Sequence, residues 1–221
     1  MNHPAQFRIF LMALLLAALV APAGRTQSPG SATLTYRKVF KDSTPEFVEI
    51  KVRADGSSTF DIRQLDDDSD PQPFQVGPAL AAKMFELAAE LKNFRDIELD
   101  VHRRIANLGQ KTFRYERGGE AYEVTFNYTV NPAATQLLNI FEGLGRQQDH
   151  LTTLQRRMRY DRLGVNEALL RFERDLDRKI IPEPERLLPV LDGIANDTRM
   201  IEITRQRARA LAERIRNSRS G

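Results

Sequence analysis

Few side chains in this sequence have the types and spacing that could do chemistry, and the first candidate is a histidine beside two arginines. His102 is followed directly by Arg103 and Arg104. An imidazole next to two guanidinium groups could act as a general base beside an anion-binding clamp. A polar surface loop explains the same three residues, and we therefore assign them no catalytic role.

The second candidate is the acidic run Asp66-Asp67-Asp68-Ser69-Asp70. The alternation of its first, third and fifth carboxylates resembles the start of an EF-hand calcium loop. The sixth position of such a loop needs a glycine and the twelfth a bidentate glutamate, but Pro71 and Gly77 stand there. We expect a solvated loop, with an adventitious calcium site as the alternative.

Motifs of the common enzyme families are absent from the sequence. It contains no G-x-S-x-G, S-x-x-K, H-E-x-x-H, P-loop or G-x-G-x-x-G pattern. It also contains no cysteine, which removes disulfides, thiol nucleophiles and thiolate metal sites. Paired carboxylates are abundant, but no spacing singles out an acid and a base. We predict a protein that is not an enzyme, with no catalytic, cofactor-binding or metal-binding residues.

The N-terminus has the composition of a secretory signal peptide over residues 1–23. Arg8 precedes an apolar run at residues 9–20, and Ala21-Pro22-Ala23 places small residues where signal peptidase cuts. A retained anchor is the alternative, but twelve apolar residues form a helix of roughly 18 Å, shorter than the ~30 Å hydrocarbon core. We expect an exported protein, periplasmic or extracellular, and the lack of cysteine points to a bacterial source.

The elements that would position any site begin after a flexible lead-in at residues 24–32. A strand is expected over residues 33–39, and residues 47–63 are typical of a hairpin with a three-residue loop that ends in Gly56. That loop length places Ile50 opposite Phe60, so that the apolar side chains share one face. The acidic segment that follows, residues 65–77, is expected to be a linker.

A second hairpin is predicted over residues 111–129. Its two-residue turn at Gly118-Gly119 places Arg114 opposite Glu123, which pairs opposite charges. One helix is expected over residues 78–94, with Pro78 in its first turn. Another is expected to begin at Pro132, with Asn131 as its N-cap. Together these elements predict an α+β domain over residues 33–145, a small antiparallel sheet with packing helices.

Residues 146–217 are predicted to form a long antiparallel helical hairpin that resembles a coiled coil. The prolines at 182 and 184 require a turn at residues 181–184. If the arms fold back there, Phe172 meets Ile194 and Val165 meets Ile201, and the second arm repeats apolar residues every seven positions. Gly164 could instead divide the first arm and produce a three-helix bundle.

Five apolar residues lie beside the seams of this hairpin. They are expected to be exposed as an interaction strip, and a homodimer is the favoured way to cover it. These candidate interaction residues are Leu163, Leu170, Leu188, Leu191 and Ile203.

The helical segment is also the basic part of the chain. Residues 146–221 contain 17 Lys and Arg against 12 Asp and Glu, a net charge of +5, and 16 of the 17 are arginine. A solvated helix surface explains such a composition. An anionic polymer or a membrane surface is the alternative partner for these arginines, and no specific nucleic acid is expected.

The N-terminal domain resembles the small emfourin-like inhibitors of thermolysin-type peptidases. The resemblance covers residues 33–144 and rests on the order of the elements, with FVEIKVRADG at residues 47–56 and KTFRYE at residues 111–116 as strand-forming segments. It implies inhibition of a secreted peptidase as the alternative function. Our first expectation is a non-catalytic envelope protein whose helical hairpin acts as a scaffold or protein-interaction module.

Overall fold

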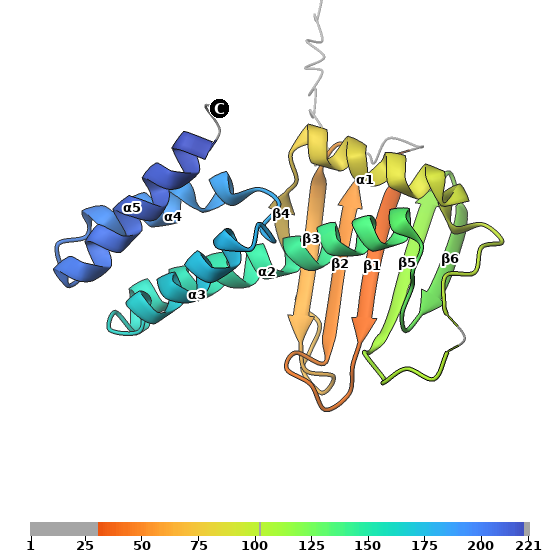
Figure 1. The fold of residues 1–221 in the computed structure, drawn as a ribbon, viewed down its shortest axis with the longest axis horizontal. Helices are drawn as coiled ribbons and strands as arrows, with labels where there is room; N and C mark the ends of the chain where they lie inside the picture. The colour runs from red at the N-terminus through yellow and green to blue at the C-terminus, as the bar shows by residue number, and fades with distance from the viewer. Residues whose placement is uncertain (1–30, 102, 219–221) are drawn as a thin grey trace, which may run out of the picture.

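The computed structural model describes residues 31–101 and 103–218. The predicted signal peptide, most of the lead-in and His102 lie outside the described residues. Figure 1 shows two parts side by side, a β-sheet with helices across one face and a separate lobe of helices. One long helix, α2, belongs to both parts.

The sheet is antiparallel, which agrees with the predicted α+β class. Its six strands follow the order β4-β3-β2-β1-β5-β6, so that β4 and β6 form the edges. Their bounds are β1 (Thr33–Val39), β2 (Phe47–Arg53), β3 (Ser57–Arg63), β4 (Gln72–Gln75), β5 (Gln110–Arg117) and β6 (Glu120–Phe126).

Both predicted hairpin registers are confirmed. Ile50 pairs with Phe60 in the β2–β3 hairpin, and Arg114 pairs with Glu123 in the β5–β6 hairpin. The Arg114 guanidinium donates to the Glu123 carboxylate at 3.1 Å. Because a turn of known length fixes which residues face each other, the pairing follows from the chain alone.

The prediction that residues 65–77 form a linker is wrong for residues 72–75, which form strand β4. Phe74 of β4 pairs with Ser58 of β3, and its ring lies 5.9 Å from the ring of Phe60. A four-residue strand containing Pro73 is tolerated because it lies at an edge, where a missing N–H breaks no ladder. The cross-strand aromatic contact decides the pairing, and sequence propensity did not reveal it.

Two helices cover one face of this sheet (Figure 1). Helix α1 (Pro78–Glu90) continues into the 3₁₀ turn η1 (Lys92–Phe94), and α2 spans Pro132–Tyr160. The predicted Asn131 cap is confirmed, since its side chain accepts a hydrogen bond from the backbone N–H of Ala134 at 3.1 Å. The core between helices and sheet centres on Phe113, whose ring lies 5.1 to 6.0 Å from four other aromatic rings.

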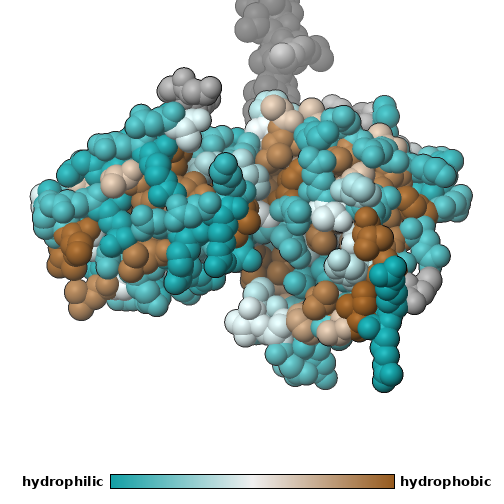
Figure 2. Space-filling view, in the orientation of Figure 1, coloured by the Kyte–Doolittle hydropathy of each residue, from teal (hydrophilic) through white to brown (hydrophobic). Residues whose placement is uncertain are grey.

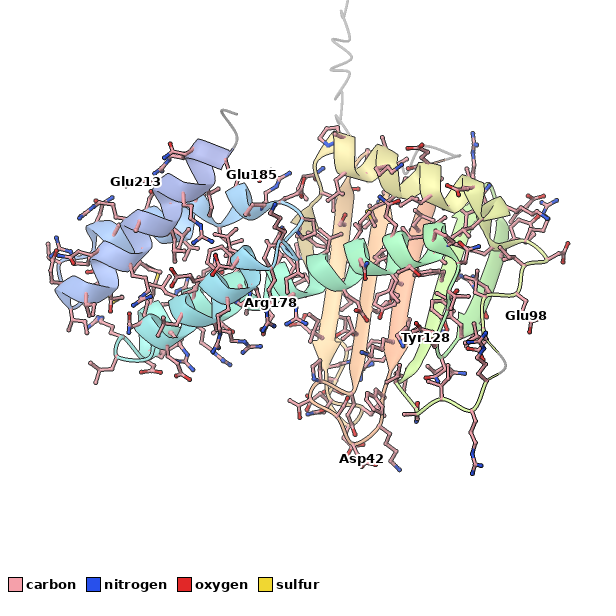
Figure 3. All side chains as sticks on the ribbon, in the orientation of Figure 1. Asp42, Glu98, Tyr128, Arg178, Glu185 and Glu213 are labelled. Atoms are coloured by element: carbon pink, nitrogen blue, oxygen red, sulfur yellow. The ribbon has the colours of Figure 1, made fainter. Side chains whose placement is uncertain are left out.

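The helical lobe contains the second half of α2 and four further elements. They are α3 (Val165–Asp177), η2 (Pro184–Leu187), α4 (Leu188–Asn196) and α5 (Glu202–Ser218). Helix α2 contributes Leu144 to the core of the sheet part and Leu154 to the separate core of the lobe. Charged side chains cover the outside of the lobe, including Arg178, Glu185 and Glu213 in Figure 3. None of the described helices combines the length and hydrophobicity that crossing a membrane requires.

The expected hairpin of two continuous arms is corrected to a bundle of two shorter helical hairpins, α2–α3 and α4–α5. The first arm breaks at residues 161–164, where Arg157 donates to the carbonyl of Gly164 at 2.6 Å. The second breaks at residues 197–201, where the buried Met200 enters the core. Val165 is buried while Ile201 is exposed, so these two residues do not form the predicted seam pair.

Candidate binding site in the helical bundle

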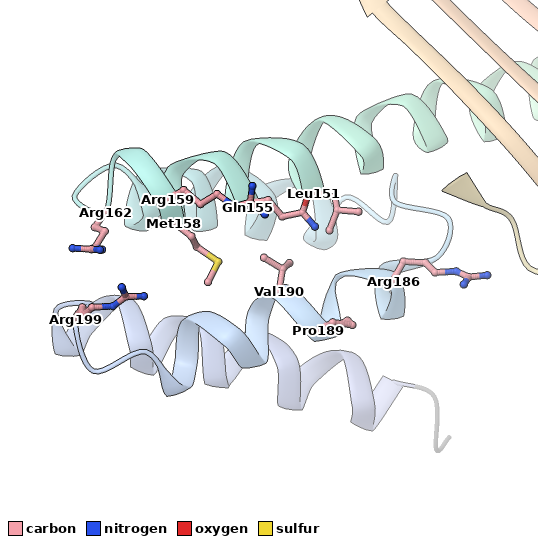
Figure 4. A pocket seen from close by; sticks show the side chains of 9 residues that line it. All are labelled: Leu151, Gln155, Met158, Arg159, Arg162, Arg186, Pro189, Val190 and Arg199. Carbon is pink, nitrogen blue, oxygen red and sulfur yellow. The ribbon is translucent and has the colours of Figure 1, made fainter. Parts of the chain in front are cut away.

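A groove of about 720 Å³ lies between α2 and α4. Its floor is apolar, and four arginines surround it (Figure 4). The lining residues are Leu151, Gln155, Met158, Arg159, Arg162, Arg186, Pro189, Val190 and Arg199. No carboxylate from the described part of the chain lines the groove.

The groove exists because α2 and α4 belong to different hairpins and are held apart by one large side chain. The terminal methyl group of Met158 lies 3.5 Å from the position that a Cβ atom would occupy at Gly193 of α4. Elsewhere in the bundle small residues such as Ala208 and Ala212 let α5 pack closely. The α2–α4 seam therefore stays open toward solvent and exposes part of its apolar floor.

Two of the four arginines already have carboxylate partners. Arg199 makes two bonds of 2.8 Å to the Asp197 carboxylate, and the hydrogen bonds from Arg199 lower the pKa of Asp197 to about 2. Arg186 lies 3.6 Å from Glu183. Within residues 31–101 and 103–218, no ion pair engages Arg159 or Arg162. The end of the groove at the α2–α3 turn therefore carries excess positive charge.

A buried carboxylate fixes the bundle against the sheet part near the other end of the groove. Glu183 accepts a hydrogen bond from the backbone N–H of Gly77 at 2.7 Å, and its own N–H donates to the side-chain oxygen of Gln147 at 3.0 Å. Burial raises the pKa of Glu183, and the Gly77 bond and Arg186 oppose that rise. The position of Arg186 is thus tied to the junction between the two parts.

A second buried polar pair joins α2 to α3 inside the lobe. Nε2 of His150 lies 2.8 Å from the carboxylate of Asp175, and Arg146 lies 3.5 Å from the same carboxylate. Burial lowers the pKa of His150, while Asp175 acts in the opposite direction. Both side chains are buried, so the pair packs the helices together and does not face a ligand.

The acidic run lines a second groove, of about 680 Å³, on the side of α2 nearer the sheet. Asp67, Asp68 and Asp70 form one wall, and Leu151 and Gln155 border this groove as well as the basic one. Two depressions of opposite charge thus adjoin along the same helix. In the part of the chain that is described, no three His, Asp or Glu side chains cluster so as to hold a metal ion.

The five predicted interaction residues do not form one strip. Leu163, Leu170 and Ile203 are exposed, and Leu188 is half-buried against the core of the lobe. Leu191 is fully buried in that core, so its assignment to an exposed surface is wrong. It turns inward because the α4–α5 hairpin closes over the face that a single long hairpin would leave open.

Two of the predicted residues, Leu163 and Ile203, belong to a cluster of exposed apolar side chains whose other two members sequence reasoning missed. Tyr160 and Leu163 at the α2–α3 turn, with Ile201 and Ile203 at the α4–α5 turn, are 82%, 80%, 52% and 56% exposed. Both turns lie at the end of the lobe farthest from the sheet (Figure 1), and we call these four residues the distal tip. Gly164 was the signal in the sequence for the first turn, as the alternative division of the first arm had it, and a polar break in the amphipathic pattern was the signal for the second.

Family models and curated proteins give no relative for this chain. No protein-family model matches it, and no curated protein matches it significantly. The resemblance to emfourin-like inhibitors stays a prediction.

Proposed function

We propose that this protein is a non-catalytic, exported protein of the bacterial envelope whose helical bundle binds a protein partner. The groove between α2 and α4 is the binding site. Its ligand is an acidic, amphipathic segment of the partner, which places apolar side chains on the floor and carboxylates against the arginines.

The observation that carries this proposal is an apolar floor surrounded by arginines, with no carboxylate among the described lining residues. A concave site of several hundred Å³ with an apolar surface and a few convergent polar groups is typical of ligand binding. A guanidinium group matches a carboxylate with two parallel hydrogen bonds, and such charge-assisted bonds are about twice as strong as neutral ones. The fixed junction at Glu183 supports the proposal because it makes the bundle a rigid platform.

Affinity capture from the envelope fraction, with the mature protein as bait, tests this function. The informative comparison is between Arg159→Glu, which reverses a charge in the groove, and Arg156→Glu, which makes the same change outside it on the same helix. Both arginines lie on the surface of α2, so both variants should fold.

We expect a partner that wild type and Arg156→Glu retain and that Arg159→Glu binds at least about tenfold more weakly, a change of about 1.4 kcal/mol. Isothermal titration with the purified partner measures the difference. A partner held equally well by all three proteins would show that the groove is not the site.

A further inference from the structure

The distal tip exposes apolar surface that folding does not explain. Single exposed apolar residues are normal, but Tyr160, Leu163, Ile201 and Ile203 come from two turns that meet at one end of the bundle. Figure 2 shows hydrophobic side chains gathered at this end of the lobe. None of the four residues lines the groove, although Arg162 and Arg199 from the same two turns do.

Arginines surround the base of the tip. Arg159 precedes Tyr160, Arg162 precedes Leu163, and Arg199 lies two positions before Ile201. Arg162 and Arg199 lie at the same end of the groove in Figure 4. The apolar residues of the tip thus adjoin in sequence three arginines that line the groove.

The carboxylates near the tip are already engaged by arginines. Asp161 pairs with Arg157, Asp197 with Arg199, and Glu202 with Arg205. Arg157 also bonds Glu167 in the first turn of α3. Arg159 and Arg162 have no ion pair among the described residues, and Arg162 acts on Asp197 only at longer range, where it helps to lower the pKa of that carboxyl. Both guanidinium groups are therefore available for an external anion.

We propose that the distal tip binds the surface of an anionic lipid bilayer. The four apolar side chains enter the layer of headgroups and first acyl carbons, and Arg159 and Arg162 bond lipid phosphates. A tyrosine suits that depth because its ring is apolar and its hydroxyl stays hydrated. Shallow insertion of apolar residues together with attraction to anionic lipids is sufficient for reversible membrane binding.

A lipid surface fits these observations better than a protein partner does. Exposed apolar side chains at one end of the lobe can enter a bilayer surface without a preformed pocket. Lipid phosphates supply the anions that Arg159 and Arg162 lack among the ion pairs of the described residues. The two proposals share Arg159 and Arg162, which line the groove, but none of the four apolar residues of the tip lines it.

The lack of tryptophan in the chain makes insertion directly measurable. In Leu163→Trp the only indole is at the tip, and in the control Val130→Trp it is at an exposed position on the sheet part. With vesicles of phosphatidylglycerol and phosphatidylcholine, the indole emission of the tip variant should shift to the blue, and the emission of the control should not. Absence of a shift in the tip variant would overturn the proposal.

Vesicle co-sedimentation of the mature protein and its variants separates the contribution of the apolar side chains to membrane binding from that of the arginines. Leu163→Asp/Ile203→Asp should lower binding at least tenfold, while the control Val130→Asp/Leu108→Asp should bind like wild type. Arg159→Gln/Arg162→Gln should weaken binding several-fold and reduce its dependence on salt. Equal binding to vesicles of phosphatidylcholine alone, or full binding by the tip variant, would contradict the proposal.

The same variants keep the two proposals distinguishable. Leu163→Asp/Ile203→Asp should still capture a groove partner, since neither residue lines the groove. Loss of partner capture in this variant, with no vesicle binding by wild type, would show instead that the tip is a protein-docking surface.

Discussion

The carboxylate of Glu183 accepts a hydrogen bond from the backbone N–H of Gly77 at 2.7 Å, joining residues 106 positions apart in the chain. Gly77 is the residue before the first turn of α1, so the bond anchors the helical lobe at the start of a sheet-packing helix. A carboxylate is also favoured there because the N-terminus of a helix carries partial positive charge. The contact between Glu183 and Gly77 is therefore specific, and changing the Glu183 carboxylate should have a measurable effect on stability.

Glu183→Gln should change how stability depends on pH. Burial holds the folded-state pKa of Glu183 above its ordinary 4.5, so the folded protein binds this proton more tightly than the unfolded chain does. The resulting stabilisation is present below pH 4.5 and is lost as the pH rises through the raised pKa. Glutamine keeps an acceptor for Gly77 and cannot titrate.

The measurement for this junction is urea unfolding of both proteins from about pH 4, below the ordinary pKa of the carboxyl, to about pH 8. The free energy of unfolding of Glu183→Gln relative to wild type should increase as the pH rises through that range. A difference that is constant with pH would contradict the assignment of Glu183 as a buried titrating group.

His150 should make the protein sensitive to acid. Burial lowers the pKa of His150 below 6.5, and repulsion by Arg171 lowers it further. Asp175 and Asp149 act in the opposite direction. Arg146 lies close to the same Asp175 carboxylate. The unfolded chain therefore takes up the proton first, and stability is lost as the pH falls from 6.5 through the folded pKa. An NMR titration of the His150 ring should give a midpoint below 6.5, and a midpoint at or above 6.5 would refute this account.

Gly143→Ala and Gly145→Ala should have opposite effects. A Cβ at Gly143 would lie 2.6 Å from the carbonyl oxygen of Ile180 and 2.9 Å from Pro182, which forces the backbone apart. A Cβ at Gly145 would lie at ordinary contact distance, 3.4 Å, from Ile50. We expect Gly143→Ala to destabilise by about 1–3 kcal/mol and Gly145→Ala to stabilise by up to about 1 kcal/mol.

Thermal and urea unfolding of the two glycine variants measure both effects on one helix. Equal changes in the free energy of unfolding for the two variants would mean that the segment at Ile180 does not pack on α2 as described.

Leu191→Ala and Leu163→Ala distinguish the bundle from a single long hairpin. Leu191 is fully buried, so its truncation should cost about 2–5 kcal/mol, whereas Leu163 is 80% exposed and its truncation should cost less than about 0.5 kcal/mol. The free energy of unfolding in urea measures both. Similar small losses in the free energy of unfolding for the two variants would support the exposed strip predicted from the sequence.

Self-association stays a prediction, and sedimentation equilibrium of the mature protein at micromolar concentration tests it. If exposed apolar residues on α3 contribute, a dimer should form and Leu170→Lys should shift it toward monomer. Leu170 is exposed on α3, away from both the groove and the tip, so the variant leaves those surfaces intact. A single species at the monomer mass in wild type would remove the homodimer.

Local chemistry in the sequence determined much of the sheet part. The Gly118-Gly119 turn and the loop ending in Gly56 set both hairpin registers, because a short turn leaves the flanking residues only one way to pair. Asn131 and Pro132 set the start of α2 because a capping side chain and a proline act within one turn. These features depend on neighbours a few residues away, and the sequence alone predicts them.

Tertiary structure alone decided how the helices are divided and what they bring together. An apolar repeat indicates that a helix has a buried face, but it does not indicate which other helix covers that face. The positions of Phe172 and Ile194 therefore agree equally well with one long hairpin and with a four-helix bundle. The groove combines Arg159 of α2 with Pro189 and Val190 of α4, and the tip combines two separate turns. Such surfaces arise from contacts between distant segments, where side-chain packing, and not local propensity, sets the geometry.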